Sequence, residues 1–471
     1  MNQKLSMPKK PNVIWIIPDQ MRAQAMSCNG DPNVHTPNLD ALAARGINFV
    51  QARSGFPLCC PARGSFLTGL YPNNCTPGHD LGLPPEKKTI AHVMRENGYK
   101  TAYFGKWHLD AEGAEGKLAP NRAVLHKIPP ERRGGFEKFN GYQNNNEPWD
   151  CYVNDDSGEF YRLKGFETDA VTDLLIDYMK EQKREEPFFA VMSVLSPHNP
   201  YLAPEEFLKD KRPSDMKLRN NVPDIAWVKE QAARELTGYY AAIENMDYNV
   251  GRIVKALDDL QLADDTYVMF FSDHGDMHGS HGQFRKTTPF EEAVRVPLII
   301  SNGHGCLYSI APPVLYGNNH AGICDALVNH VDIAPTTLGL CNIPVPDWMQ
   351  GFDYSGHVTG ILPKNEPAEV YLQCNIPTMH HNSIGAAWRG IVTKDGWKYV
   401  AVEGHEWLLY NLNDDPYEQM NMALIADYIP KKIKLNNLLG EWIRKTGDSF
   451  ELPEIAPPVE INIFALPDER L

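Results

Sequence analysis

Residues 11–20 read PNVIWIIPDQ, an apolar run (Val13–Ile17) that Pro11 precedes and Asp19 closes. A short apolar run rich in β-branched residues is typical of a strand that is buried on both faces. Two lysines precede the run, as in a secretion signal, but it ends after six residues without a small-residue cleavage site. We therefore predict a first buried strand, in a chain that is cytoplasmic as given. Removal of a leader before this numbering would make the protein periplasmic or secreted.

Further apolar runs of the same kind follow along the chain. They are bounded by turn or polar residues, and they span Thr101–Phe104, Phe188–Leu195, Tyr267–Ser272 and Pro297–Ser301. Between two of them, apolar residues recur every three or four positions from Tyr239 to Leu257, which predicts a helix with one apolar face. Strands that alternate with helices predict an α/β fold, with a large, mostly parallel or mixed sheet flanked by helices. Ligands of such sheets collect at the carboxyl ends of the strands, where Asp19 and Asp273 both lie.

The pattern changes after about residue 360. Turn-rich segments there separate short apolar runs, which span Glu369–Gln373, Lys398–Val402 and Trp407–Tyr410, and a helical stretch follows from Pro430 to Arg444. This pattern predicts a smaller α+β subdomain, made of an antiparallel sheet and one helix. We therefore divide the chain into residues 1–362 and residues 363–471.

The composition excludes several classes of protein. Of 471 residues, 42% are hydrophobic and 22% are charged, as in a globular enzyme, and no apolar run approaches the ~20 residues that span a bilayer. The nine cysteines are scattered without a CxxC pair, so they suit neither a disulfide framework nor a structural zinc site. The net charge of −15 argues against nucleic acid as a partner. An anionic substrate would therefore need a local cationic pocket.

The most informative segment is residues 59–69, CCPARGSFLTG. Pro61 and Gly64 bracket a turn, and the residues after it are suited to open a helix whose N-terminus favours an anion. A nucleophile and a negatively charged substrate would fit such a place. A cysteine pair beside a turn is, by itself, equally typical of a buried thiol.

The pattern C-x-P-[SA]-R-x-x-x-L-T-G in this segment resembles the signature of the type I sulfatases, in the alkaline-phosphatase-like superfamily. Further segments resemble that family in the same order: 36–40 (TPNLD), 98–101 (GYKT), 105–108 (GKWH), 196–200 (SPHNP), 272–275 (SDHG) and 409–412 (LYNL). The resemblance covers roughly residues 11–425. It implies the alkaline-phosphatase-like fold and hydrolysis of a sulfate ester.

The resemblance also implies the nucleophile. In this family a maturation enzyme oxidises the first cysteine of the motif to formylglycine. One hydroxyl of the hydrated aldehyde attacks sulfur, and the other later expels sulfate. By position this residue is Cys59, while Cys60 is an incidental neighbour.

The resemblance further implies a site for one divalent metal ion. Its ligands would be Asp19, the formylglycine at position 59, Asp273 and His274. Gln20 can offer a carbonyl oxygen, either as a further ligand or as a residue that supports the ligands. Oxygen ligands favour calcium or magnesium, whereas the nitrogen of His274 leaves room for manganese or zinc. Many relatives carry Asp-Asp where this chain has Asp19-Gln20, and Asn where it has His274. Phosphonate monoester hydrolases of the superfamily carry Asp-Gln and Asp-His at these places, so sulfate preference stays open.

Cationic and acid–base residues accompany this set. Arg63 can contact the oxygens of the nucleophile with two donors, and Lys106 and Lys286 supply point charges for the sulfate. His108 is the candidate base for the second hydroxyl. His198 is the candidate for sulfate binding or for protonating the leaving oxygen.

The motifs do not specify the leaving alcohol. Three loops, Asn144–Asp150, Tyr316–His320 and Met379–Asn382, are rich in Asn, His or Trp, which suits hydrogen bonding to a sugar and stacking on it. Candidate substrate-binding residues are Trp149, His278, His380 and His381. We therefore expect a carbohydrate sulfatase that acts on a small sulfated saccharide, with the C-terminal subdomain completing its pocket. We expect no nucleic-acid or membrane partner, and we leave a homo-oligomeric state open.

Three alternatives remain. One is a phosphonate monoester or phosphodiester hydrolase, or an arylsulfatase, on the same scaffold. Another is a silent protein that only holds sulfated glycans, although such a protein would not need Cys59 in its Pro-Ala-Arg context. The third is a cysteine hydrolase that uses a thiolate at Cys59, which would need an activating histidine and would leave the metal residues unexplained.

Overall fold

The computed structural model describes residues 10–79, 81–110, 125–302, 322–375, 378 and 384–457. Within these residues, ten strands form one large sheet. In spatial order they are β11 (Ile323–Cys324), β2 (Ile47–Phe49), β10 (Leu298–Asn302), β9 (Thr266–Phe271), β1 (Asn12–Pro18), β8 (Phe188–Val194), β4 (Lys100–Lys106), β5 (Lys138–Tyr142), β6 (Tyr152–Asn154) and β7 (Phe160–Arg162). A two-stranded sheet pairs β3 (Ala52–Arg53) with β12 (Val328–Asn329).

The centre of the large sheet is parallel, and its flanks are mixed. Strand β1 pairs in parallel with β8 and β9, and β4 pairs in parallel with β8 and β5. Strand β10 runs antiparallel to β9, and β6 runs antiparallel to β5. The strands predicted from the apolar runs are β1, β4, β8, β9 and β10, so the predicted mixed α/β sheet is confirmed.

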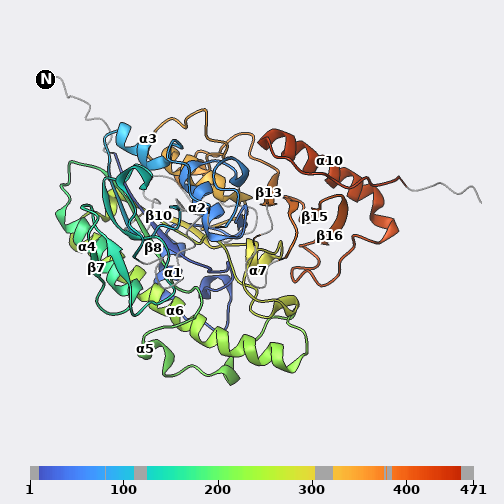
Figure 1. Cartoon of the computed structure of the whole chain (residues 1–471), viewed down its shortest axis with the longest axis horizontal. Helices are drawn as coiled ribbons and strands as arrows, with labels where there is room; N and C mark the ends of the chain where they lie inside the picture. Colours follow the sequence, from blue (N-terminus) through green and yellow to red (C-terminus); the bar gives the residue numbers. More distant parts are fainter. Residues whose placement is uncertain are drawn as a thin grey trace, which may run out of the picture.

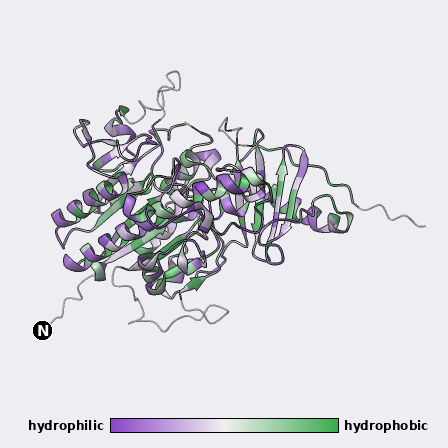
Figure 2. Ribbon diagram, turned by 90° about the horizontal axis from the view of Figure 1, so that it is seen from below, coloured by the Kyte–Doolittle hydropathy of each residue, from purple (hydrophilic) through white to green (hydrophobic). Residues whose placement is uncertain are grey.

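Helices cover both faces of this sheet (Figures 1 and 2). One face packs against α1 (Pro37–Arg45), α4 (Glu167–Glu181) and α6 (Ala226–Asp259), the other against α2 (Cys59–Thr68), α3 (Ile90–Glu96) and α8 (Ile333–Leu340). Side chains of β1 alternate between the two cores, with Ile14 and Ile16 on the first face and Trp15 on the second. The remaining short helices are α5 (Glu205–Leu208), α7 (Glu291–Val294) and α9 (Ser355–Thr359).

The C-terminal part forms a separate antiparallel sheet with one long helix, as predicted (Figure 1). Its strands are β13 (Glu369–Cys374), β14 (Trp388–Thr393), β15 (Trp397–Val402) and β16 (His405–Asn411), and its helix is α10 (Ile429–Thr446). One face of the sheet packs against α10, and the other shares a core with Phe56 and Leu58. The C-terminal sheet therefore buttresses the segment that leads into Cys59. The division at 362/363 stays a prediction; it lies between α9 and β13.

No helix in the described ranges is both long and apolar enough to cross a membrane.

Candidate active site

The candidate residues meet because parallel strands end at the same edge of the sheet. Asp19 follows β1, Asp273 follows β9, Lys106 is the last residue of β4, and His198 follows β8. These four strands are neighbours in the order β9-β1-β8-β4 and run parallel, so their carboxyl ends lie together.

Cys59 is the first residue of α2, so the helix begins earlier than predicted and includes Pro61 and Gly64, which were expected to form a turn before it. Its sulfur lies 3.2 Å from Nε2 of His274, 3.2 Å from Nζ of Lys286 and 3.7 Å from Oδ1 of Asp19. If residue 59 is oxidised to formylglycine, as the resemblance implies, an oxygen would take the place of this sulfur. Burial opposes a negative charge here, yet Lys286, Lys106 and His274 hold the pKa of Cys59 well below its ordinary value. The position therefore favours an anion.

Four side chains form a compact group of potential metal ligands. One ligand atom from each of Asp19, Cys59, Asp273 and His274 lies within 4.8 Å of the others, and all four residues are buried. His274 directs Nδ1 at the carbonyl of Gly275, 3.0 Å away, which leaves Nε2 facing the group. Two carboxylates, one imidazole nitrogen and the atom on residue 59 are a donor set that fits a divalent cation.

The electrostatics of the two carboxylates support this fit. Burial, followed by the nearby charge of Asp19, raises the pKa of Asp273. Burial also opposes ionisation of Asp19, but Lys106 and Lys286 keep its pKa below the ordinary value. Two buried carboxylates at such close range repel each other, and a bound cation would relieve that repulsion.

Three buried cations surround the ligand group. Arg63 bridges the carboxylates, with Nη2 at 3.1 Å from Asp19 and 3.0 Å from Asp273. Nζ of Lys106 lies 2.7 Å from Asp19. Nζ of Lys286 lies near Cys59 and also contacts Oε1 of Gln20 at 3.0 Å. We call these three cations, with Asp19, Cys59, Asp273 and His274, the catalytic cluster. The cluster thus gathers three cations on a chain whose net charge is −15.

His198 stands directly beside Lys286. Its Nδ1 points at the carbonyl of Asn199, 2.7 Å away, so Nε2 is free to accept from Nζ of Lys286 at 3.0 Å. Burial and the charge of Lys286 hold the pKa of His198 well below its ordinary value. His198 is therefore neutral in this arrangement and receives a hydrogen bond from Lys286.

His108 lies beside both cysteines of the motif and helps to lower the pKa of each thiol. Its backbone has a φ of 55°, and its ring lies edge-on to that of His79 at 6.0 Å. Burial opposes ionisation of Cys60, but His108 and His79 lower its pKa to about 6. Cys60 is thus a partner of the candidate base and not an incidental neighbour. His79 was not singled out from the sequence, because no motif includes it.

The candidate substrate residues lie in different surroundings. Trp149 is 47% exposed, and its ring packs against Phe166 at 5.1 Å. His278 is buried instead, with ring centroids 4.3 Å from Tyr239 and 5.1 Å from Tyr201. Burial among aromatic rings favours a structural role over contact with a substrate. His380, His381 and the loop Tyr316–His320 lie outside the described residues.

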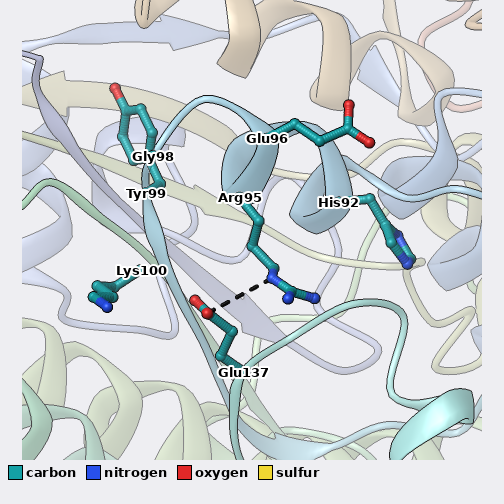
Figure 3. A pocket seen from close by; sticks show the side chains of 7 residues that line it. All are labelled: His92, Arg95, Glu96, Gly98, Tyr99, Lys100 and Glu137. Carbon is teal, nitrogen blue, oxygen red and sulfur yellow. Dashed lines mark ion pairs between the residues drawn. The ribbon is translucent and has the colours of Figure 1, made fainter.

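A separate surface cavity opens at the other end of β4 (Figure 3). Its lining consists of His92, Arg95, Glu96, Gly98, Tyr99, Lys100 and Glu137. Arg95 pairs there with Glu137 at 3.7 Å. Lys100 begins β4 and Lys106 ends it, so the length of the strand, roughly 20 Å, separates this cavity from the catalytic cluster.

Comparisons with known proteins agree with this geometry. The family model described as Sulfatase matches residues 11–343, and the one described as N-sulphoglucosamine sulphohydrolase, C-terminal, matches residues 279–445. The chain is 33% identical to an ulvan-active sulfatase of Formosa agariphila, over 94% of this chain and 83% of the relative. It is 28% identical to an endo-4-O-sulfatase of Bacteroides thetaiotaomicron, over 91% of this chain and 88% of the relative.

Solved structures share the fold. A Bacteroides fragilis protein assigned as a sulfatase superposes with a TM-score of 0.81 and 28% identity, covering 95% of this chain and 98% of its own. The phosphonate monoester hydrolase of Agrobacterium radiobacter gives a TM-score of 0.74 at 24% identity, covering 93% of this chain and 96% of its own. The second likeness concerns the fold alone.

Proposed function

Because the chain belongs to the sulfatase family and is a sulfuric ester hydrolase, we propose that it removes sulfate from a small sulfated saccharide, with a formylglycine formed at Cys59 as the nucleophile. The observation that carries this proposal is the catalytic cluster, in which Cys59 begins a helix and contacts His274 and Lys286. The formylglycine diol would supply one hydroxyl to attack sulfur and a second to release sulfate. A formylglycine-generating enzyme is therefore the required maturation partner.

Asp19, Gln20, Asp273, His274 and the modified residue 59 would hold one divalent cation. Calcium is our first choice, with magnesium or manganese as alternatives. When bound, the ion would neutralise a sulfate oxygen and lower the pKa of the attacking hydroxyl.

The protein's own residues would do the remaining work. Arg63 and Lys106 hold the carboxylate of Asp19 in place, and Lys286 carries positive charge to the atom that attacks. Lys286 would thus stabilise the negative charge that grows on the sulfate oxygens in the transition state. His108, which lies beside residue 59, would take the proton of the second hydroxyl. His198 is neutral in this arrangement, so a bound sulfate would have to raise its pKa before it protonates the leaving oxygen.

Two observations support a sugar as the leaving group. The relatives include an ulvan-active sulfatase, an endo-4-O-sulfatase and an N-acetylglucosamine-6-O-sulfatase. The exposed Trp149 offers an indole face for stacking on a sugar ring.

A second candidate function is hydrolysis of phosphonate monoesters or phosphodiesters. The specific observation in its favour is the pair Gln20 and His274, the residue types that the resemblance associates with phosphonate monoester hydrolases. A substrate panel separates the two functions: sulfated mono- and disaccharides, an aryl sulfate, a phosphonate monoester and a phosphate diester. We expect the highest kcat/KM on a sulfated saccharide. A higher kcat/KM on the phosphonate would favour the second function.

The first test concerns residue 59 itself. The protein is produced together with a formylglycine-generating enzyme, and the tryptic peptide 54–63 is analysed by mass spectrometry. We expect an aldehyde at Cys59 and an unmodified Cys60. An intact thiol at Cys59 in a protein that still hydrolyses sulfate esters would contradict the proposed mechanism and favour the thiolate alternative.

A further inference from the structure

Gln20 differs from the other candidate ligands, because an amide can present either an oxygen or a nitrogen to the site. Oxygen ligates a cation, whereas the NH₂ group cannot. The side chain is buried, so solvent does not decide between the two orientations. Its neighbours must therefore choose one of them.

The neighbours of Gln20 place its amide oxygen on the side of the catalytic cluster. On the side of the catalytic cluster, the ammonium of Lys286 donates to Oε1 at 3.0 Å. On the other side, Nε2 lies 2.6 Å from Oδ2 of Asp276, and 3.4 Å from both Oδ1 of Asn199 and the hydroxyl of Tyr201. A flipped amide would place Oε1 of Gln20 against Oδ2 of Asp276, and its NH₂ group against the ammonium of Lys286. Both of these contacts would be repulsive. The shortest of these contacts is the one with Asp276.

Asp276 is itself held in place as an acceptor. Its Oδ1 accepts the backbone N–H groups of His278 at 3.1 Å and of Arg285 at 3.0 Å. Its Oδ2 accepts the hydroxyl of Tyr201 at 2.5 Å besides the amide of Gln20. Burial and the charge of Asp276 raise the pKa of Tyr201 well above its ordinary value, so this hydroxyl stays protonated and donates. These four groups all donate hydrogen bonds to Asp276.

The Tyr201 hydroxyl is held from outside as well. Nη1 of Arg285 lies 2.8 Å from this hydroxyl and 2.7 Å from Oε2 of Glu235.

The backbone of Gln20 has a φ of 71°, a conformation that is uncommon for a residue with a side chain. Asp273 accepts its N–H at 3.0 Å, and Tyr239 donates to its carbonyl at 3.2 Å. Backbone and side chain of Gln20 are therefore held independently.

We infer that Asp276 is the positioning residue that turns the oxygen of Gln20 towards the cation, making Gln20 a neutral ligand. This inference rests on the proposed function only in assuming a cation at Asp19, Asp273 and His274. It also accounts for the buried carboxylate behind a neutral ligand, because the negative charge of Asp276 orients the amide and does not touch the ion.

The test is a double-mutant cycle read by cation binding. Matured full-length protein is stripped with a chelator and titrated with Ca²⁺ by calorimetry. Asp276→Asn, which keeps the size of the side chain but adds an N–H donor, should weaken Ca²⁺ binding about 10-fold or more, as loss of such outer partners does. In a Gln20→Ala background the same change should cost less than about twofold, because no amide remains to be oriented. An equal loss in both backgrounds would overturn the inference, and so would unchanged binding by Asp276→Asn.

Two further variants keep the test decisive. Tyr201→Phe removes only the hydroxyl that donates to Asp276, so it serves in the same cycle if Asp276→Asn does not fold. We expect a smaller loss that also disappears with Gln20→Ala, and a loss that persists there would overturn the inference. Asp247→Asn is the matched control, since that carboxylate accepts from Asn38 and Leu39 on α1.

The titration needs no substrate, so the two ideas fail separately. Wild-type protein that binds Ca²⁺ but hydrolyses no sulfated sugar would contradict the proposed function. The cycle would still decide the role of Asp276. If the wild-type protein desulfates a sugar and Asp276→Asn leaves the Ca²⁺ affinity unchanged, only the inference is contradicted.

Discussion

Two buried clusters of charge lie in this protein, and they are built differently. The catalytic cluster joins strand ends of the large sheet to α2. A second group, which we call the interface cluster, joins α7 to the C-terminal sheet. It consists of Arg53, Arg219, Glu291, Glu292, Lys398 and Glu418. Both clusters contain three cations, so burial of charge does not by itself distinguish a reactive site from a structural one.

The difference is in the partners of the cations. In the interface cluster every cation contacts a glutamate: Arg53 and Lys398 reach Glu291 at 2.9 and 3.0 Å, and Arg219 reaches Glu292 at 2.8 Å. In the catalytic cluster Lys286 contacts Cys59, Gln20 and His198, and no carboxylate among the described residues. A buried cation without a carboxylate partner is available for an anionic substrate. A second possible ligand group, His281, Glu292 and Glu418, is already matched by cations, so we do not expect it to need a metal.

We expect the largest effect on turnover from Cys59→Ser, which changes the catalytic cluster and leaves the interface cluster intact. Serine has one hydroxyl, so it cannot replace a formylglycine diol that uses two. We expect turnover of a sulfated saccharide to fall by on the order of 10³-fold or more, while the melting temperature stays close to that of the wild type. Initial rates and thermal melts of the same preparations measure both. Substantial activity in the serine variant would mean that the diol is not required.

The corresponding change in the interface cluster is Lys398→Met. It removes the cation between Glu291 and Glu418 and leaves two buried carboxylates with less compensation. We expect the free energy of unfolding to fall by about 3–5 kcal/mol, with kcat little changed in the folded fraction. Urea unfolding followed by fluorescence measures the first quantity.

The matched control for that change is Lys255→Met. Lys255 pairs with Asp259 on the exposed surface of α6, so its loss should change stability by less than about 1 kcal/mol. If Lys398→Met cost no more than this control, the interface cluster would not be a structural lock between the two sheets.

An intermediate effect is expected from Lys286→Met, which tests the unpaired cation directly. We expect kcat/KM for the sulfated substrate to fall about 10²-fold, as for loss of a group that stabilises transition-state charge. Stability should change little or rise, because no carboxylate loses its partner. A large loss of stability with normal turnover of the folded protein would show that Lys286 belongs with the structural cations.

The comparison also shows what could be predicted from the sequence. The central strands were predictable because each is a short apolar run, and the site was predictable because its residues follow those runs within recognisable motifs. Strand β14 was missed because Arg389 and Gly390 interrupt its apolar pattern. Arg389 is nonetheless buried, since Asp448, 59 residues further along the chain, pairs with it at 2.5 Å. No local pattern contains such a partner.

Residues of the DHGDMH loop illustrate the same limit at the site. His278 was expected near the substrate, and the structure buries it against Tyr239. Asp276 was not singled out, although it contacts Gln20 from 256 positions away. The places of His278 and Asp276 depend on which side of the loop faces the edge of the sheet. The spacing of histidines and aspartates along the sequence does not predict that side.

The smallest effect concerns Asp332, a buried carboxylate that has no ion-pair partner among the described residues. Burial raises its pKa to about 7, although the N–H groups of Phe352 and Asn329 favour the charged form. A raised pKa means that the folded protein binds this proton more tightly than the unfolded chain. Its contribution to stability is therefore complete below about pH 4 and is lost as pH rises towards 7, with a slope of about 1.4 kcal/mol per pH unit.

Asp332→Asn should remove that slope between pH 4 and 7, whatever constant stability difference the amide introduces. Chemical unfolding of wild type and variant across this range measures the difference. Parallel pH profiles would mean that Asp332 is ionised in both states. The prediction sharpens the comparison between the clusters, because Asp332 has no ion-pair partner in the described part of the chain. The cations that contact Asp19 and Glu291 outweigh burial and hold the pKa values of these two carboxylates below the ordinary range.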